Sequence, residues 1–116
     1  MKKRKIIFIS TNRADYNIQK KIIYSLSKNK KNSLILIITG THLSKKFGYT
    51  KSDLDTNKLK TILIKNLVKS DKRENVLDCI SEGIKKFKKV IKKISPDIVV
   101  LIGDRYEILS MAICCL

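Results

Sequence analysis

Long hydrophobic stretches are absent from this sequence. Its apolar runs extend over about five or six residues, whereas a helix that spans a bilayer needs about 20. The basic start MKKRKIIFIS turns polar at Thr11. It is too short for the apolar core of a secretory signal and lacks a small-residue cleavage site. We therefore expect a cytoplasmic protein without a membrane partner.

Cysteine is also scarce. Cys79, Cys114 and Cys115 show no CxxC spacing and have no nearby histidine, whereas metal sites need such ligands at regular spacing. We expect reduced thiols that fill apolar space, and no metal. The glycine-rich signatures GxGxxG and GxxxxGK are missing as well, so neither a dinucleotide fingerprint nor a P-loop is supported. We expect no cofactor.

Acidic residues are few, with 10 against 26 lysines and arginines, which gives a formal charge of +16. Such an excess is typical of proteins that bind nucleic acid or an anionic membrane surface. Only four of the 26 are arginine, however, and arginine is the residue that recognises phosphate with two prongs. Runs of lysine usually form solvated faces, and A/T-rich codons also explain an excess of lysine, isoleucine and asparagine. We expect a solvated surface and keep a small basic nucleic-acid-binding protein as an alternative.

Short apolar segments alternate with amphipathic ones along the chain. The apolar runs predict strands, and segments with apolar residues every three or four positions predict helices. We expect strands at 5–10, 34–39, 61–65 and 98–102, and helices at 18–26, at 73–94 and from 105 onward. Pro96 ends the long helix, because proline disfavours helical geometry in the residue before it. The irregular segment 40–58 is expected to be a functional loop with short helical pieces.

This alternation predicts an α/β fold with a Rossmann-like parallel sheet and helices on both faces. No repeat or linker divides residues 1–116, which we expect to form one domain. The chain stops within an apolar helical segment, MAICCL, and so we expect this domain to be incomplete. In parallel sheets of this kind, ligands bind at the carboxyl ends of the strands. That rule selects residues 10–17, 40–43 and 103–107.

The first two strand ends each offer a candidate. Arg13 lies at a helix start, where backbone N–H groups attract phosphate, and its guanidinium adds a two-pronged donor. The alternative is that Asp15 caps this helix and Arg13 is a surface residue. His42 is the only histidine, and it can exchange protons or hydrogen-bond a sugar or phosphate near neutral pH. The alternative for His42 is an ordinary loop residue.

The third strand end combines a turn with two charges. Gly103 allows the backbone to turn or to approach a ligand closely. Asp104 and Glu107 have the spacing of a capping box, so Asp104 is a candidate helix cap. Arg105 opposes the dipole of a helix that starts there. A cation placed against this preference indicates a nearby anion, which capping alone does not explain.

Three motifs, in this order, closely resemble a known family. TNRADY (11–16), TGTHLSKKFGYT (39–50) and PDIVVLIGDRYE (96–107) are similar to the N-terminal half of the hydrolysing UDP-N-acetylglucosamine 2-epimerases of sialic-acid pathways. The resemblance covers nearly the whole chain. Non-hydrolysing relatives have a GTRPE-like first motif and a GDTTT-like third motif, so NRADY and GDRYE favour the hydrolysing branch.

The resemblance implies a two-domain fold of the glycosyltransferase-B type, with the active site between two Rossmann-like domains. It also implies a reaction in which a base removes the C2 proton of the sugar while UDP leaves from C1. Water then adds to the glycal and yields N-acetylmannosamine. The leaving diphosphate needs cations and N–H donors, and carboxylates must handle protons within hydrogen-bonding reach.

Matched position by position, the resemblance gives each candidate a role. Arg13 and Arg105 correspond to arginines on the nucleotide side. Asp104 corresponds to an acid/base or cation-stabilising aspartate. His42 corresponds to a histidine that helps to position the substrate and is grouped with the catalytic residues. Asn17 falls where relatives often have serine, and an amide there still donates a hydrogen bond to the nucleotide.

The family's further acidic residues and its second domain lie beyond residue 116. The resemblance therefore implies an N-terminal fragment, inactive alone, of an enzyme expected to be a homo-oligomer that binds a UDP-sugar and no nucleic acid. A sibling enzyme that acts on UDP-N,N'-diacetylbacillosamine shares these motifs and stays an alternative. A glycosyltransferase of the same fold fits the motifs less well.

Overall fold

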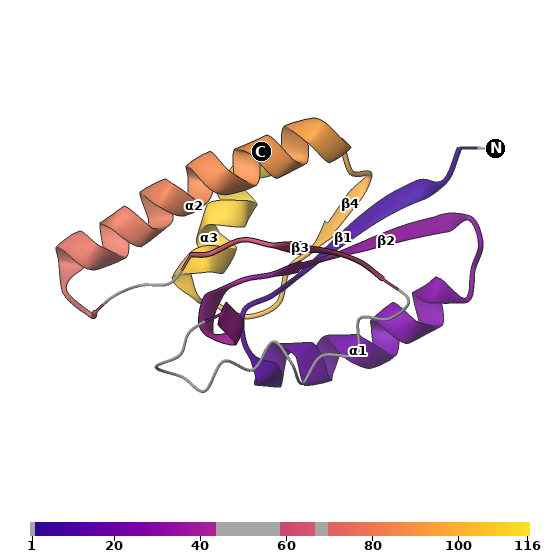
Figure 1. Ribbon diagram of the computed structural model, residues 1–116, viewed down its shortest axis with the longest axis horizontal. Helices are drawn as coiled ribbons and strands as arrows, with labels where there is room; N and C mark the ends of the chain where they lie inside the picture. Colours follow the sequence, from indigo (N-terminus) through magenta and orange to yellow (C-terminus); the bar gives the residue numbers. More distant parts are fainter. Residues whose placement is uncertain (1, 44–58, 67–69) are drawn as a thin grey trace.

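The computed structural model describes residues 2–43, 59–66 and 70–116. Four parallel strands form one sheet in the order β3-β2-β1-β4. They are β1 (Arg4–Ser10), β2 (Asn32–Ile38), β3 (Lys60–Leu63) and β4 (Ile98–Val100). In Figure 1, the helix α1 (Arg13–Ser27) lies on one side of the sheet, and α2 (Arg73–Ile94) and α3 (Tyr106–Cys114) lie on the other. The predicted α/β class with helices on both faces is confirmed.

The central strand β1 is buried on both sides because both faces of the sheet are covered. Successive side chains of a strand point to opposite faces. Accordingly, Ile6 and Phe8 belong to the apolar cluster under α1, whereas Ile7 and Ile9 belong to the cluster under α2 and α3. Phe87 of α2 is fully buried in the second cluster. The sequence reads as an unbroken apolar run here because neither face of the strand meets water.

The helix α2 begins and ends at the expected residues. Its last residue is followed by Ser95, whose φ of 50° is left-handed and whose N–H bonds to the carbonyl of Ile91. The apolar stripe of α2 is not buried along its whole length, because Leu77 is 54 % exposed. Figure 1 shows the first turns of α2 extending past the sheet, where no strand lies beneath them. In α1, Ile18 is likewise 60 % exposed.

The helices α2 and α3 pack closely at a glycine. A Cβ added to Gly83 would lie 2.6 Å from Oγ of Ser110 and 2.7 Å from its Cβ. Ser110 Oγ donates a 2.9 Å hydrogen bond to the carbonyl of Ile80. The absence of a side chain at Gly83 is therefore what lets the two backbones approach, and this crossing fixes α3 on the sheet.

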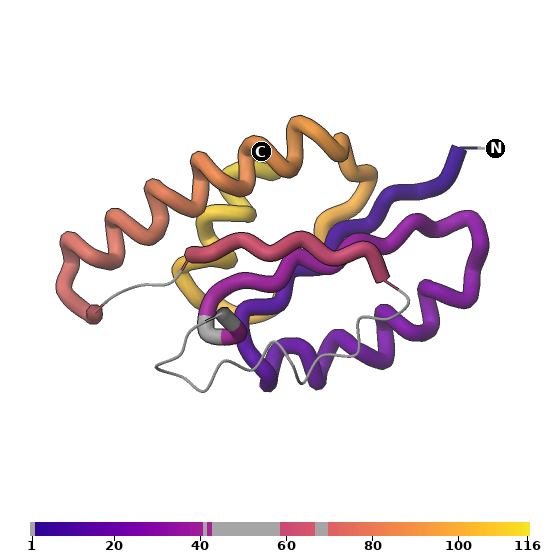
Figure 2. The backbone as a smooth tube through the Cα atoms, viewed as in Figure 1, coloured from indigo at the N-terminus to yellow at the C-terminus, as the bar shows by residue number. Residues whose placement is uncertain are grey.

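The irregular segment after β2 begins with a short helical piece, η1 (Gly40–Leu43). The remainder of the predicted loop, 44–58, lies outside the described residues. The smooth trace in Figure 2 shows that the turns after β1, β2 and β4 lie at the same end of the sheet. Within the described part of the chain, no helix is both long enough and apolar enough to cross a membrane.

Candidate active site at the carboxyl edge of the sheet

The three strand ends selected by the sequence contact one another. Gly40, at the end of β2, has a φ of +64°, and a Cβ there would lie 2.7 Å from the carbonyl oxygen of Thr11 and 3.3 Å from Oε1 of Glu107. Gly103, after β4, has a φ of +90° and approaches the carboxylate of Asp15, whose Oδ2 would lie 3.5 Å from an added Cβ. Both glycines adopt left-handed backbone that side-chain-bearing residues rarely take. The turns after β1, β2 and β4 therefore form one continuous cluster.

The turn after β1 is held by hydrogen bonds within the motif STNRAD. Asn12 is the N-cap of α1, and its Oδ1 accepts the N–H of Asp15 at 2.8 Å. Asp15 lies one turn inside the helix, where its Oδ2 accepts the hydroxyl of Thr11 at 2.7 Å. The alternative in which Asp15 itself caps the helix is wrong, because the chain enters the helix three residues earlier than that cap requires. The Asp15 carboxylate instead lies against the turn after β4.

His42 joins the end of β2 to the end of β1. Its side chain is fully buried, and its Nε2 lies 2.7 Å from Oγ of Ser10. Ser10 Oγ in turn donates to the carbonyl of Asn12 at 3.3 Å. Which of the two groups donates in the Ser10–His42 hydrogen bond depends on the tautomer of the imidazole. The imidazole thus holds the turn after β1 from beneath.

The turn after β4 carries an internal ion pair. Arg105 donates from Nε to Oε2 of Glu107 and from Nη2 to Oε1, each at 3.2 Å. Arg105 is also the N-cap residue of α3, and no side chain makes a capping hydrogen bond there. The expected capping box of Asp104 and Glu107 was therefore wrong, and Asp104 is exposed. Glu107 is one anion that accounts for the unfavourable placement of Arg105 at the start of this helix.

The remaining candidates lie on the surface beside this cluster. Arg13 and Asn17 are exposed on the first turns of α1, four positions apart, and so occupy the same side of that helix. Asp104 is next to Gly103, which approaches Asp15 of the same helix. No hydrogen bond between described residues joins Arg13 or Asn17 to Asp104. The structure therefore brings the segments together and leaves the exposed side chains at their rim.

Two residues of the cluster were missed by sequence reasoning. Ser10 is fully buried at the end of β1 and bonds to His42, and Thr11 is fully buried beside it. The available signal was two hydroxyl residues that directly follow an unbroken apolar strand. Polar groups that follow a buried strand need partners. Ser10 has His42 on the turn after β2 as its partner, and Thr11 donates to Asp15 in the first turn of α1.

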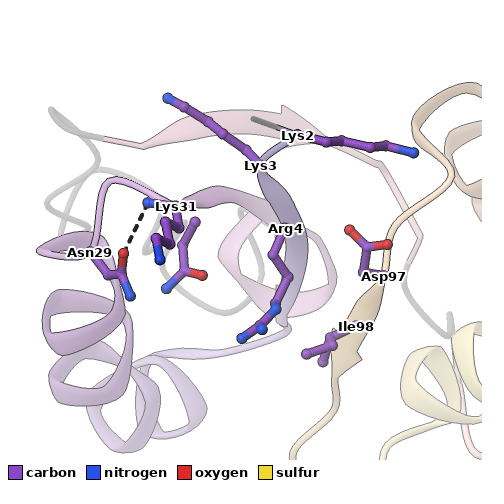
Figure 3. Close-up of a pocket in the computed structure, with 8 residues that line it drawn as sticks. Lys2, Lys3, Arg4, Asn29, Lys31, Asp97 and Ile98 are labelled. Atoms are coloured by element: carbon purple, nitrogen blue, oxygen red, sulfur yellow. Dashed lines mark hydrogen bonds between the residues drawn. The ribbon is translucent and has the colours of Figure 1, made fainter.

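A hollow lies at the opposite edge of the sheet, where the strands begin. This depression of about 410 Å³ is lined by Lys2, Lys3, Arg4, Asn29, Lys31, Asn32, Asp97 and Ile98. Figure 3 shows Lys2 and Lys3 extending in opposite directions rather than toward one point. The carboxylate of Asp97 accepts the backbone N–H of Lys5 at 2.8 Å. The hollow thus has a single acid, already used by the backbone, and lacks the converging groups of the carboxyl edge.

The cysteines contribute no ligand cluster among the described residues. All three are free thiols, and the described part of the chain has no group of three or more histidine, cysteine, aspartate and glutamate side chains able to hold a metal ion. Burial raises the pKa of Cys79 to about 11, with a further contribution from the charge of Glu107. Cys115 is exposed, so the expectation that it fills apolar space was wrong.

Comparison with known proteins identifies the family. The family model described as UDP-N-acetylglucosamine 2-epimerase matches residues 24–116 of this chain. The chain belongs to the UDP-N-acetylglucosamine 2-epimerase family. The matched range includes the turns after β2 and β4, and therefore His42, Asp104 and Arg105.

Individual relatives carry names of the same family. A GDP/UDP-N,N'-diacetylbacillosamine 2-epimerase (hydrolyzing) from Campylobacter jejuni is 34 % identical over all 116 residues of this chain, which correspond to 30 % of that protein. A UDP-N,N'-diacetylbacillosamine 2-epimerase (hydrolyzing) from Legionella pneumophila is 28 % identical over 95 % of this chain and 29 % of its own length. A UDP-N-acetylglucosamine 2-epimerase from Neisseria meningitidis is 29 % identical over 94 % of this chain and 28 % of its own length. The chain thus spans a little under a third of these relatives.

The fold agrees with that of the family. A crystal structure of a UDP-N-acetylglucosamine 2-epimerase superposes with a TM-score of 0.75 at 19 % sequence identity, over 99 % of this chain and 29 % of that one. Such epimerase structures are Rossmann α/β folds of the glycosyltransferase-B type. In this 2-epimerase family member, the cluster of turns therefore lies at the edge of the sheet where Rossmann-like folds bind ligands.

Proposed function

We propose that this chain supplies the N-terminal part of a hydrolysing UDP-N-acetylglucosamine 2-epimerase, with residues that contact the UDP moiety. The overall reaction converts UDP-N-acetylglucosamine and water to N-acetylmannosamine and UDP, through elimination to a glycal and its hydration, for the biosynthesis of sialic acid or a related sugar. The observation that carries the proposal is the contact of three strand-end turns at one edge of the sheet, with Arg13, Asp104 and Arg105 on those turns. Family membership restricts what such an edge binds.

The proposed division of labour follows from the chemistry. The C2–H of the sugar has no adjacent carbonyl to acidify it, so cleavage of the C1–O bond must run ahead and leave positive charge on the ring. Arg13 and Arg105 are proposed to stabilise the leaving diphosphate. Asp104, exposed at the rim, is proposed to exchange a proton or to stabilise the ring cation. Asn17 is proposed to hydrogen-bond the nucleotide from the first turns of α1.

The proposed role of His42 rests on its contact with Ser10. Its imidazole is fully buried and bonds to Ser10 beneath the turn after β1. We propose that it assists catalysis by fixing this turn, and so by positioning Arg13 relative to the substrate. Replacement of His42 by alanine is then expected to weaken substrate binding through the turn.

A second substrate is favoured by a specific observation. The relative that is 34 % identical over this whole chain is named for N,N'-diacetylbacillosamine. This sugar differs from N-acetylglucosamine at positions 4 and 6, and the proposed elimination across C1 and C2 is the same for both. UDP-N,N'-diacetylbacillosamine is therefore the alternative substrate, and turnover of the two UDP-sugars by the complete enzyme separates them.

The proposed partner is a UDP-sugar, with neither a membrane nor nucleic acid as ligand, and the complete enzyme is proposed to be a homo-oligomer. The proposed compartment is the cytoplasm, where unpaired thiols such as the three free cysteines stay reduced. Because the chain spans about 30 % of its relatives, we expect no release of UDP from UDP-N-acetylglucosamine by the 116 residues alone. In the complete enzyme, Asp104→Asn is expected to abolish turnover.

Binding of UDP to the purified chain tests the proposal. Calorimetric titration is made with the wild-type chain and with three variants that each remove one positive charge: Arg13→Ala, Arg105→Ala and Lys85→Ala. Lys85 is a matched control, because its side chain is 72 % exposed on α2 and pairs only loosely with Glu82. We expect both arginine variants to weaken UDP binding about tenfold, in line with the loss of a charged hydrogen bond, and Lys85→Ala to leave it unchanged.

Equal loss in all three variants contradicts the proposed site. It indicates that UDP is held by overall charge, as in the alternative of a basic nucleic-acid-binding protein. That alternative also predicts tight binding to duplex DNA with a steep dependence on salt, and indifference of that binding to Arg13→Ala. A DNA titration at two salt concentrations completes the comparison.

A further inference from the structure

Glu107 is a buried carboxylate that the proposed reaction does not use. It lies in the first turn of α3, and its side chain is completely inaccessible to solvent. Burying a charge is costly unless the charge is paired and hydrogen-bonded. The partner of Glu107 is Arg105, which reaches both carboxylate oxygens at 3.2 Å. Such a costly arrangement at the rim of a candidate site needs an explanation beyond the start of a helix.

The geometry of the pair leaves part of Arg105 available. A guanidinium has five N–H donors, and Glu107 engages the Nε–H and one N–H of Nη2. Both N–H groups of Nη1 and the second of Nη2 point away from this pairing edge, because the guanidinium is planar. Arg105 keeps 30 % of its side chain exposed, whereas Glu107 keeps none. The pair therefore buries its negative member and exposes part of its positive member.

The neighbouring turn is shaped to admit Glu107. A Cβ at Gly40 would lie 3.3 Å from Glu107 Oε1 and 2.7 Å from the carbonyl oxygen of Thr11. Contacts this short force the surrounding atoms to move. The left-handed φ of +64° at Gly40 further disfavours any side chain. The end of β2 thus leaves the space in which the carboxylate lies.

We propose that Glu107 is a positioning residue, which holds the guanidinium of Arg105 so that its outer N–H groups face a diphosphate at the carboxyl edge of the sheet. Gly40 is the residue that makes room for this carboxylate. The inference rests on the proposed function for the identity of the anion. It goes beyond that function because Glu107 acts on the ligand only through Arg105.

The direction in which Glu107→Gln changes the affinity for UDP separates this positioning role from a purely electrostatic one. Glu107→Gln keeps the shape but removes a negative charge close to the anion site, so Coulomb's law alone predicts tighter binding of UDP. Positioning predicts the opposite, because the amide NH₂ cannot accept a hydrogen bond and Arg105 loses one of its two anchors. We expect UDP binding about tenfold weaker in Glu107→Gln. Glu82→Gln is the control, since Glu82 is 55 % exposed in a surface pair with Lys85, and its effect should be less than twofold.

A double-mutant cycle and a spectroscopic signal complete the test. In an Arg105→Ala background, Glu107→Gln should change UDP affinity less than twofold, since its only route to the ligand is gone. In ¹H–¹⁵N spectra, the Arg105 Nε–H should be slow to exchange in the wild type and fast in Glu107→Gln, with the dispersion of the backbone amides unchanged.

Equal or tighter binding in Glu107→Gln, or the same loss with and without Arg105, overturns the inference. If UDP binds to none of the chains, the proposed function fails. The Nε–H exchange then decides the positioning role by itself, and fast exchange in the wild type overturns it.

Discussion

Gly83→Ala should destabilise the chain, although the same change stabilises most helices. In a helix interior, alanine is favoured over glycine by about 1 kcal/mol. Here the new Cβ would meet Ser110 Oγ at 2.6 Å and Ser110 Cβ at 2.7 Å, so α2 and α3 must separate. Overpacking of this kind costs about 1–3 kcal/mol, and loss of the bond from Ser110 to Ile80 adds about 1 kcal/mol. The expected net loss in the free energy of unfolding is about 1–3 kcal/mol.

Urea denaturation of the wild type and the variant measures this difference. With slopes of about 1–3 kcal/mol per molar urea for small domains, the midpoint should fall by about 1 M. A Ser110→Gly background provides the control, because it removes two of the three atoms that the new methyl group would strike and leaves only Nδ2 of Asn66, at 2.6 Å. In that background Gly83→Ala should cost less than it does in the wild-type background. A stabilised Gly83→Ala in the wild-type background refutes the close crossing of α2 and α3.

Three further results are expected. Asn12→Ala removes the acceptor for the N–H of Asp15 and should lower stability by about 1 kcal/mol, measured by urea denaturation, whereas an unchanged midpoint contradicts the cap. Phe87→Ala empties a fully buried site and should cost about 3–5 kcal/mol in the same assay, and a cost below 1 kcal/mol contradicts its burial. The pKa of Cys79 is about 11 in the folded chain, whereas its ordinary value is 9.0. As the pH rises from 9 to 11, the unfolded chain therefore loses this proton first. The stability that the neutral thiol contributes is lost over the same range. The stability difference between wild type and Cys79→Ala should therefore shift against the wild type over this range, and a constant difference contradicts the shift.

Much of the fold was predictable because its signals are local. The helix α2 was expected at 73–94, and it was found there, since a 3–4 residue apolar period and Ser95-Pro96 define its length and its end. The four strands were recognisable as apolar runs, although β4 ends at Val100 rather than at residue 102. The pairing with β1 ends at Phe8 with Val100, although β1 itself continues to Ser10 and pairs there with β2. The apolar run of one strand does not contain the extent of its pairing with a neighbour, and that extent decides where the strand ends.

The candidate site was only partly predictable because its contacts are not local. Residues 10 and 42 are 32 positions apart, and their hydrogen bond exists only because β1 and β2 are neighbours. The spacing of Asp104 and Glu107 suits a capping box, but the helix begins one residue later than that box requires. The spacing of these two residues does not determine at which residue the helix begins. The placement of the three turns at one edge, by contrast, followed directly from the parallel order of the strands.

We propose that the carboxyl edge of the sheet is the surface that meets a UDP-sugar. Residue-by-residue ¹H–¹⁵N chemical shifts of the chain, recorded during titration with UDP-N-acetylglucosamine, test it most directly. We expect saturable changes confined to residues 10–17, 40–43 and 103–107, with none at the basic hollow around Lys2 and Lys31. Changes that appear at that hollow or along the lysines of α2, while the three turns stay unaffected, would contradict it.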